Sequence, residues 1–285
     1  MRFTLSSTAL SSKLFALAKV ISNKNSLPIL ADFMFRTEGN TLFITASDSE
    51  NSMTTTIELS DSDIDDSFAI ENHSLLEAVK SFPEQPLTFE ADKNDKIVKI
   101  IYQNGQFSLP IESADVYPVA AKIADIAVSI QLSSALLSEN ISRCLCATAQ
   151  DELRPVMNGV FFDITPEYLT IVSTDGHKLV RNRIYDIKND VAASLILAKK
   201  PATILKNMLA KDDTLVTITF DNRNAEVTFG DTRLLCRLID GRYPNYNSVI
   251  PQNNQNVLHV DRETLLGALK RVLPFASDSS NLVRF

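Results

Sequence analysis

Several residue types that mark common protein classes are scarce in this chain. Its 285 residues include no tryptophan, seven glycines and three cysteines. So few glycines argue against a glycine-rich nucleotide-binding fold. Cys144, Cys146 and Cys236 fit neither a disulfide framework nor a zinc-ligand spacing, so we expect a reducing cytoplasm and no metal or other cofactor. No apolar run approaches the roughly 20 residues of a membrane-spanning helix, so no membrane contact is expected.

The rest of the composition is that of an ordinary globular protein. Hydrophobic residues make up 45% of the chain and charged residues 22%, which excludes wholesale disorder and collagen-like repeats. Single hydrophobic cores stop growing at about 250 residues, so the length indicates two domains or slightly more. Lys13 and Lys19 interrupt the apolar N-terminal stretch, which therefore reads as mature protein rather than as a signal peptide.

The charges are distributed unevenly along the chain. The net charge is −7, but residues 1–31 contain Lys13, Lys19 and Lys24 and no acidic residue. Residues 195–211 contain Lys199, Lys200, Lys206 and Lys211, again without an acid. A local basic face of this kind can bind phosphates on an otherwise acidic protein. The alternative is that these lysines only stabilise the last turns of helices.

An internal repeat organises the chain. Shifting the sequence by 127 residues aligns its first sixty residues without a gap, and a third copy begins at an offset of 255. Aligned pairs include Leu10 with Leu137, Pro28 with Pro155, Phe35 with Phe162, Asp48 with Asp175 and, for the third copy, Leu10 with Leu265. We therefore divide the chain into a first copy (1–126), a second copy (127–254) and the start of a third (255–285).

Each copy has the pattern of an α+β domain. The apolar residues Leu10, Leu14, Leu17 and Ile21 have helical spacing, and we expect second helices over 74–82 and 202–209. Pro201 is expected at the first position of its helix. With roughly eight alternating strands per copy, antiparallel sheets are the expectation. A third copy of equal length would extend to about residue 380, so we expect the 285 residues to be part of a longer protein.

Four motifs carry a resemblance to a known family. They are SLPIL at 26–30, LRPVMNGV at 153–160, STDGHKL at 173–179 and LIDGRYPNY at 238–246. In this order and on this repeat, the chain resembles the bacterial DNA polymerase III beta subunit, the sliding clamp. The resemblance implies tandem clamp domains, the third incomplete, in a head-to-tail homodimeric ring around duplex DNA. Helices would line the hole, and the sheets would lie outside.

The resemblance implies two kinds of binding residue. The implied DNA contacts are Lys24, His73, Gln150, Lys199 and Lys200, on an inner face that also carries Lys13, Lys19, Lys80, Arg143, Lys206 and Lys211. The implied peptide cleft, named the copy-two cleft below, consists of Met157, Thr174, Gly176, His177, Lys178, Leu179, Pro244 and Val249. A sliding protein needs diffuse attraction to phosphates rather than base contacts, which lysines supply.

The family also implies partners and the absence of catalysis. A sliding clamp tethers the polymerase III alpha subunit, the clamp loader and other proteins that carry a clamp-binding motif, whereas polymerase and 3′–5′ exonuclease activities belong to the holoenzyme. Ring closure would involve Phe107, Leu109 and Phe275. Because the third copy is incomplete, we expect the 285-residue chain not to close into the normal ring.

Two other functions remain open at this point. Asp175 and His177 could serve a cytosolic hydrolase, although the first copy has no histidine at the matching position. In that case His177 would be a general base. The other interpretation makes Asp175 a turn residue beside the permissive backbone of Gly176. A repeat scaffold that binds only proteins is the other alternative, and it would not depend on the lysines.

Overall fold

The computed structural model describes residues 1–22, 25, 27–125, 127–151, 153–276 and 282–283. The chain forms two compact units, Met1–Tyr243 and Pro244–Phe285, which are considered separately. Among the described residues, none of the helices combines the length and the apolar character needed to cross a membrane.

The first copy contains two α-helices and nine strands within the described residues. In chain order they are β1 (Arg2–Ser6), α1 (Ser7–Leu17), β2 (Asp32–Glu38), β3 (Thr41–Ser47), β4 (Asn51–Glu58), β5 (Asp61–Ser62), β6 (Ser67–Glu71), α2 (Asn72–Val79), β7 (Pro86–Asp92), β8 (Ile97–Tyr102) and β9 (Gly105–Ser113). Short 3₁₀ turns, η1 (Pro28–Ala31) and η2 (Ala114–Val116), precede β2 and follow β9.

The second copy repeats this order with two helices and eight strands in its described part. The elements are β10 (Val128–Ser133), α3 (Ser134–Leu145), η3 (Pro155–Met157), β11 (Gly159–Ile164), β12 (Leu169–Thr174), β13 (Leu179–Ile184), β14 (Ala193–Ala198), α4 (Lys199–Met208), β15 (Leu215–Phe220), β16 (Asn224–Phe229) and β17 (Thr232–Arg237).

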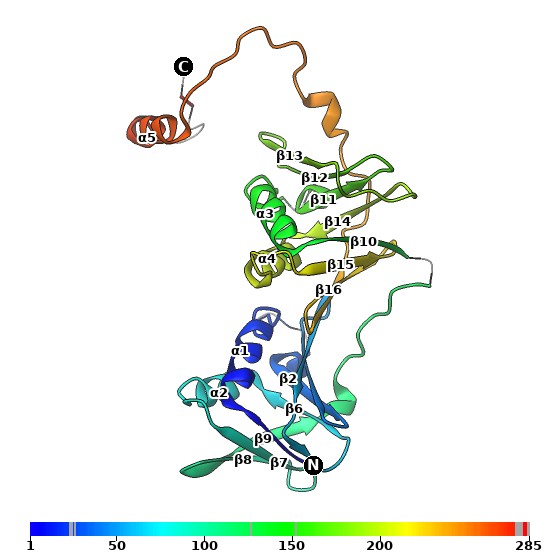
Figure 1. The fold of residues 1–285 in the computed structure, drawn as a ribbon, viewed down its shortest axis with the longest axis vertical. Helices are drawn as coiled ribbons and strands as arrows, with labels where there is room; N and C mark the ends of the chain where they lie inside the picture. The colour runs from blue at the N-terminus through cyan, green and yellow to red at the C-terminus, as the bar shows by residue number, and fades with distance from the viewer. Residues whose placement is uncertain (23–24, 26, 126, 152, 277–281, 284–285) are drawn as a thin grey trace. The chain divides into compact units, whose positions relative to one another are not determined.

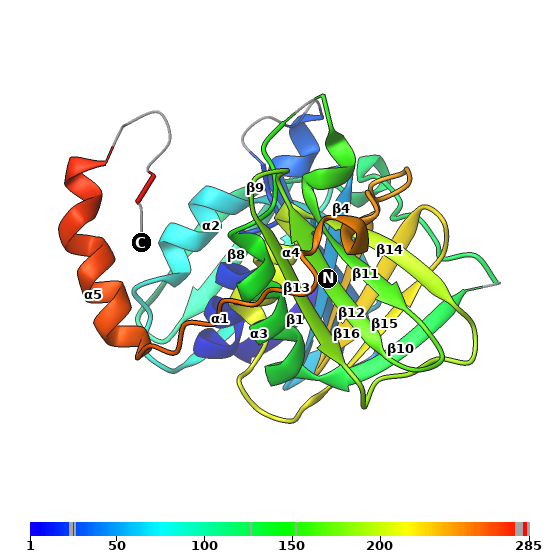
Figure 2. The same ribbon diagram turned by 90° about the horizontal axis from the view of Figure 1, so that it is seen from above.

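The two copies share one sheet. Thirteen strands follow the order β10-β15-β16-β17-β4-β3-β2-β6-β9-β8-β7-β1-β5, and the order of the remaining four is β13-β12-β11-β14. The copies join where β17 pairs antiparallel with β4, from Thr232 opposite Thr55 to Cys236 opposite Asn51. Helices α1, α2, α3 and α4 lie on one side of these sheets (Figures 1 and 2). The α+β class and the antiparallel pairing predicted from the sequence are confirmed.

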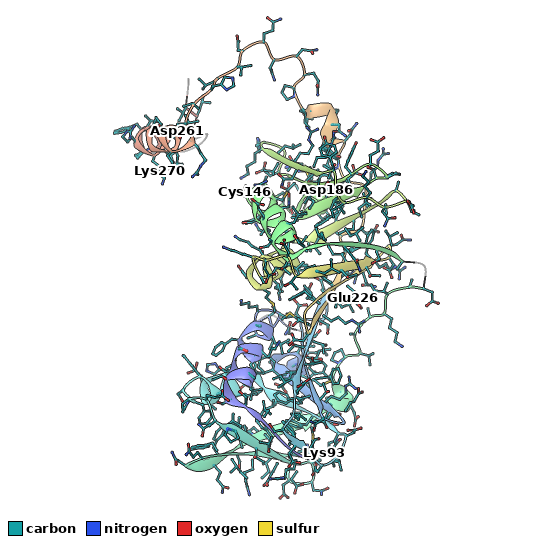
Figure 3. All side chains as sticks on the ribbon, in the orientation of Figure 1. Lys93, Cys146, Asp186, Glu226, Asp261 and Lys270 are labelled. Atoms are coloured by element: carbon teal, nitrogen blue, oxygen red, sulfur yellow. The ribbon has the colours of Figure 1, made fainter. Side chains whose placement is uncertain are left out.

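The repeat extends to the details of how helices begin. The hydroxyl of Ser6 accepts the Ala9 N–H at the start of α1, and Ser133, 127 residues later, accepts the Leu136 N–H at the start of α3. Such side-chain caps satisfy backbone donors that have no partner inside the helix. In the second unit, Asp261 caps α5 (Arg262–Val272) by accepting the Thr264 N–H. Figure 3 labels Asp261, which precedes α5, and Lys270, which lies in the last turn of this helix.

The cores of the two copies differ in composition. Leu10 and Leu14 in α1 and their equivalents Leu137 and Ile141 in α3 are fully buried. The first copy adds a cluster of stacked rings, in which the centroids of Phe3 and Phe89 lie 5.0 Å apart. Burial of each such side chain stabilises the fold by about 1.5–3 kcal/mol.

Some predicted boundaries were wrong. Helix α1 ends at Leu17, so Ile21 follows the helix instead of lying on it. Helices α2 and α4 begin at Asn72 and Lys199, earlier than expected. Pro201 is therefore the third residue of α4, where its missing N–H still costs nothing because the first-turn donors lack partners within the helix.

Candidate nucleic-acid interface and peptide cleft

The helix-bearing side of the first unit carries most of the predicted DNA contacts. His73 is the second residue of α2 and is exposed, and Gln150 is exposed in the segment after α3. Lys199 and Lys200 open α4. Lys24 lies outside the described residues.

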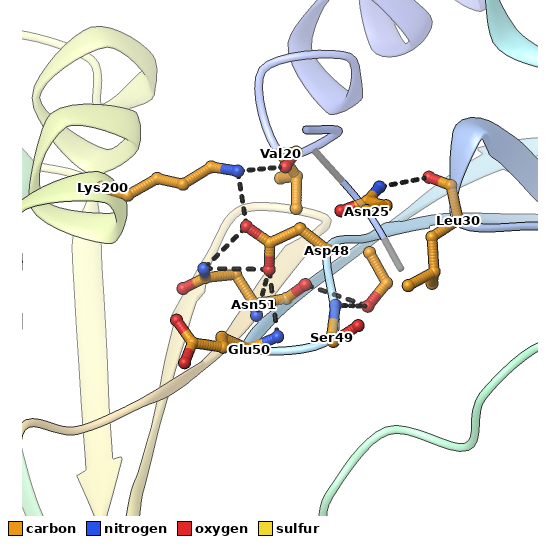
Figure 4. Close-up of polar contacts among 9 residues, drawn as sticks. Val20, Asn25, Leu30, Asp48, Ser49, Glu50, Asn51 and Lys200 are labelled. Atoms are coloured by element: carbon orange, nitrogen blue, oxygen red, sulfur yellow. Dashed lines mark hydrogen bonds and ion pairs between the residues drawn. The ribbon is translucent and has the colours of Figure 1, made fainter. Parts of the chain in front are cut away.

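Lys200 already has partners from the first copy. Its ammonium group donates to the Val20 carbonyl at 2.6 Å and to the carboxylate of Asp48 (Figure 4). Burial alone would raise the pKa of Asp48, but hydrogen bonds from Lys200 and Asn51 outweigh it and hold this pKa below its ordinary value. The Asp48 side chain keeps only 8% of its surface exposed. Lys200 therefore joins the two copies.

A second ion pair crosses the same junction. Lys13 of α1 pairs with Asp231, which lies just before β17. Asp231 also accepts from the hydroxyl of Thr232 at 3.1 Å. Two of the lysines assigned to the inner face from the sequence thus have acidic partners from the other copy.

A basic groove lies between α3 and α4. It has a volume of 790 Å³, and Arg143, Lys206 and Lys211 line it together with Ser138 and Ser142. Arg143 pairs with Glu139 one turn earlier on α3. Among the described residues, Lys206 and Lys211 form no ion pair, so their ammonium groups are free to attract an anion.

The copy-two cleft is built around the turn between β12 and β13. Thr174 ends β12 opposite Leu179, which opens β13. The Thr174 hydroxyl donates to the Lys178 carbonyl at 2.8 Å and accepts the Gly176 N–H at 3.1 Å. Because the turn backbone is fixed in this way, His177 and Lys178 project from it as exposed side chains.

Gly176 allows two neighbouring side chains to approach the turn. Its φ is +90°, a backbone conformation that residues other than glycine rarely adopt. A Cβ here would lie 3.1 Å from Nη1 of Arg154 and 3.8 Å from the terminal methyl of Met157. The structure thus brings Met157 beside the turn. Pro244 and Val249 belong to the second unit, where both are exposed.

Sequence reasoning missed two contributors beside this turn. Arg154 lies against Gly176, and its Nε donates to Asp151 at 2.9 Å. Tyr243 stacks on Phe161, with ring centroids 4.5 Å apart and planes 2° from parallel. The three-residue spacing of Asp151 and Arg154 was a usable signal, whereas the Tyr243–Phe161 stack joins residues far apart in the sequence.

The Asp175 carboxylate serves the turn itself. Its Oδ1 accepts the backbone N–H groups of Lys178 and His177, each at 2.9 Å. These bonds, led by that from Lys178, lower the pKa of Asp175 to about 2. Within the described part of the chain, the carboxylate has no bond to the imidazole of His177, so the geometry does not favour the hydrolase alternative.

The residues predicted for ring closure lie in different units. Phe107 and Leu109 are half-buried on β9, in the half that pairs with β8 and not with β6. Phe107 packs on Phe82, with ring centroids 6.3 Å apart. Phe275 in η5 (Leu273–Phe275) of the second unit is 90% exposed.

Comparison with known protein families gives the class of protein. The family model for the DNA polymerase III beta subunit, N-terminal domain, matches residues 1–121, and the model for the central domain of the same subunit matches residues 131–245. The chain belongs to the DNA polymerase III beta subunit family.

Individual relatives agree with this assignment. The beta sliding clamp of Pseudomonas putida is 24% identical over 286 residues, covering 100% of this chain and 77% of that protein. The crystal structure of the Bacillus subtilis DNA polymerase sliding clamp is 25% identical, with a TM-score of 0.90 over 98% of this chain and 75% of that one. A Helicobacter pylori beta clamp bound to a DNA ligase peptide has the same fold, with 20% identity and a TM-score of 0.85 over 95% of this chain and 75% of that one.

Proposed function

We propose that the protein is a DNA sliding clamp, a processivity factor that encircles duplex DNA and tethers the replicative polymerase. One observation carries this proposal: two clamp-type domains share a continuous sheet through β17 and β4, and all four of their α-helices lie on one side. We place the domain boundaries at 1–126, 127–254 and 255–285, the last being the start of a third domain. The full-length protein would form a homodimer.

The proposed role is non-catalytic. Polymerase and exonuclease activities would belong to the holoenzyme, and the clamp would act in the cytoplasm with the alpha subunit, the clamp loader and other clamp-binding proteins. Its contribution is a topological link, so attraction to DNA can stay weak and independent of sequence.

The proposed DNA-binding residues are Lys24, His73, Gln150, Lys199 and Lys200. His73 and Gln150 are exposed, which allows them to reach phosphates. Lys200 would act largely through position, because it holds the carbonyl of Val20, four residues before Lys24. The exposed ammonium groups of Lys206 and Lys211 would supplement this face.

The copy-two cleft is the proposed peptide site. Met157 and Leu179 supply apolar surface, and the turn that contains Thr174 and Gly176 is held by internal hydrogen bonds. The Helicobacter pylori relative binds a DNA ligase peptide. By similarity we propose that short apolar segments of replication and repair proteins bind this chain at the cleft residues of the first unit.

A loading experiment tests the proposed function. The intact gene product would be loaded by a clamp loader onto nicked circular DNA and then separated by gel filtration. We expect the protein to stay with the circle and to be released when the DNA is cut to a linear form. Equal retention on both forms would contradict the topological link.

A further inference from the structure

The first copy contains a groove at the place that corresponds to the cleft of the second. The turn between β3 and β4, residues 47–52, forms its floor, and segment 118–121 forms one wall. Arg223, Leu235 and Arg237 of the second copy line the other wall. The groove, named the copy-one groove below, has a volume of 240 Å³ and lies entirely within the first unit.

The repeat relates this groove to the copy-two cleft position by position. Adding 127 to Ser47 and to residues 49–52 gives Thr174 and residues 176–179, five of the cleft positions. Pro118 and Pro244 likewise follow the equivalent tyrosines Tyr117 and Tyr243. An inference from this relation rests on the proposed peptide-binding function of the copy-two cleft.

The chemistry of the copy-one groove is different. Where the cleft has His177 and Leu179, the groove has Glu50 and Ser52. The opposite wall adds the exposed guanidinium groups of Arg223 and Arg237. The charged residues that line the groove are thus two arginines and one glutamate, in a protein whose net charge is −7. Arginine binds carboxylates in paired, directional hydrogen bonds.

The acidic groups near the groove do not form ion pairs with these arginines within the described residues. The carboxylate of Asp221, close to Arg223, accepts the backbone N–H groups of Ala124, Arg223 and Asn224. Burial would raise the pKa of Asp221, but these bonds and the nearby charge of Arg223 lower it. Arg237 uses its backbone N–H for the carbonyl of Glu50.

The floor of the groove is fixed before any ligand arrives. Asp48 accepts the N–H groups of Glu50 at 3.1 Å and Asn51 at 2.7 Å, and the Ser47 hydroxyl donates to the Asn51 carbonyl at 3.0 Å (Figure 4). Lys200 holds Asp48 from the side of α4. A preorganised site loses little conformational entropy on binding.

We propose that the copy-one groove binds an extended acidic segment of a partner protein. Carboxylates of the segment pair with Arg223 and Arg237, and its apolar residues contact Val119, which is 91% exposed. The groove is lined by strands, turns and the connecting segment rather than by the four helices. This arrangement favours a peptide over duplex DNA, which the proposed function places against the helices.

Fluorescence anisotropy of a labelled, end-capped peptide of alternating glutamate and leucine tests the proposal on the 285-residue chain. We expect Arg223→Ser with Arg237→Ser to weaken binding at least about tenfold. The control Arg233→Ser removes an exposed arginine of β17, the strand that carries Arg237, and should leave binding unchanged. Glu50→Gln should strengthen binding about two- to threefold, a gain that misfolding cannot produce. Equal losses in the control, or no gain with Glu50→Gln, would overturn the proposal.

A second set of measurements distinguishes binding at the copy-two cleft from binding at the copy-one groove. Leu179→Asp should abolish binding of an uncharged apolar peptide at the copy-two cleft and leave acidic-peptide binding intact. Loss of acidic-peptide binding in Leu179→Asp would mean one shared site and would refute the groove. Binding of the apolar peptide alone would refute the groove but support the proposed function. Binding of the acidic peptide alone would support the groove but contradict peptide binding at the copy-two cleft. Displacement of the acidic peptide by duplex DNA, with the same arginine dependence, would make the groove a nucleic-acid site and overturn the proposal.

Discussion

The same turn serves different purposes in the two copies. Asp48 and Asp175 are equivalent in the repeat, and each accepts backbone N–H groups two and three residues later. In the first copy, Lys200 of the other copy binds the aspartate, and the carboxylate is nearly buried. In the second, the partner is Lys178 of the same turn, and Asp175 is more exposed. The repeated turn therefore keeps its local hydrogen bonds in both copies, while its aspartate pairs with the other copy in one case and with its own turn in the other.

The largest expected effect concerns the cores. Leu10→Ala and Leu137→Ala remove equivalent, fully buried side chains, and each should lower the free energy of unfolding of its copy by about 2–5 kcal/mol. Urea unfolding followed by circular dichroism measures both. A loss below about 1 kcal/mol in either variant would show that its copy collapses around the cavity, and the two cores would then not be equivalent.

The aspartates of the two turns should differ in the same assay. Asp48→Ala leaves Lys200 without its carboxylate, and we expect a loss of about 1–3 kcal/mol, below that for a fully buried pair because Lys200 keeps 37% of its side chain exposed. Asp175→Ala should cost less than about 1 kcal/mol because its ion pair is at the surface. Adding Lys200→Met to Asp48→Ala should recover part of the loss. Equal effects of the two alanine variants would contradict the comparison.

Another pair of equivalent positions should make the pH dependence of stability differ between the two copies. Asp32 in the first copy corresponds to Gly159 in the second. Burial, followed by the charges of Glu71 and Glu112, raises the pKa of Asp32 from 3.8 to about 6. Between these values the folded protein holds a proton that the unfolded chain has released, so this contribution to stability falls as the pH rises from about 4 to about 6.

Asp32→Asn should therefore raise the melting temperature at pH 7 to 8 and have little effect near pH 4. Asp95→Asn, which removes an exposed carboxylate, is the control for net charge. The same gain from Asp95→Asn would contradict the assignment to Asp32. Asp48 has the opposite sign: its pKa is lowered, so its contribution is present above its ordinary pKa and is lost as the pH falls through its folded value.

The smallest expected effect distinguishes two lysines of α4. Lys206→Ala should weaken binding of duplex DNA a few-fold and reduce the slope of affinity against salt by about 1, because its ammonium group is free to attract phosphate. Lys200→Ala should leave this slope unchanged because its ammonium group is held by Asp48 and Val20. Fluorescence anisotropy at several salt concentrations measures both slopes. Equal slopes for the two variants would show that the Lys200 ammonium group leaves Asp48 and binds phosphate instead.

Much of the fold could be predicted because the repeat transfers local signals. Helices α1, α3 and α5 begin at residues 7, 134 and 262, in accord with the offsets of 127 and 255. Pairing between copies could not be predicted in the same way. The contact of β17 with β4 and that of Lys200 with Asp48 join residues more than 150 positions apart, and neither has a periodic signature.

The candidate site was predictable where it depended on a turn. The motif at 173–179 contains Thr174 and Gly176, whose hydrogen bonds and φ define the β12–β13 turn. The availability of each lysine was not predictable, because it depends on which acidic groups the fold brings near. Lys13 and Lys206 are both lysines of helices in the first unit, yet Lys13 is paired with Asp231.

The pairing of β4 with β17 has a consequence for protein synthesis. Strand β4 ends at Glu58, and its partner emerges only after Arg237, about 180 residues later. At 5–20 residues per second, the ribosome needs roughly ten to forty seconds to supply that partner. During this interval a nascent first domain exposes a strand edge that could pair with a neighbouring chain. The threonines at 54–56 are uncharged and have a high β propensity, so nothing in this run opposes such pairing, and the waiting strand depends on the rest of its own chain for protection on a crowded polysome.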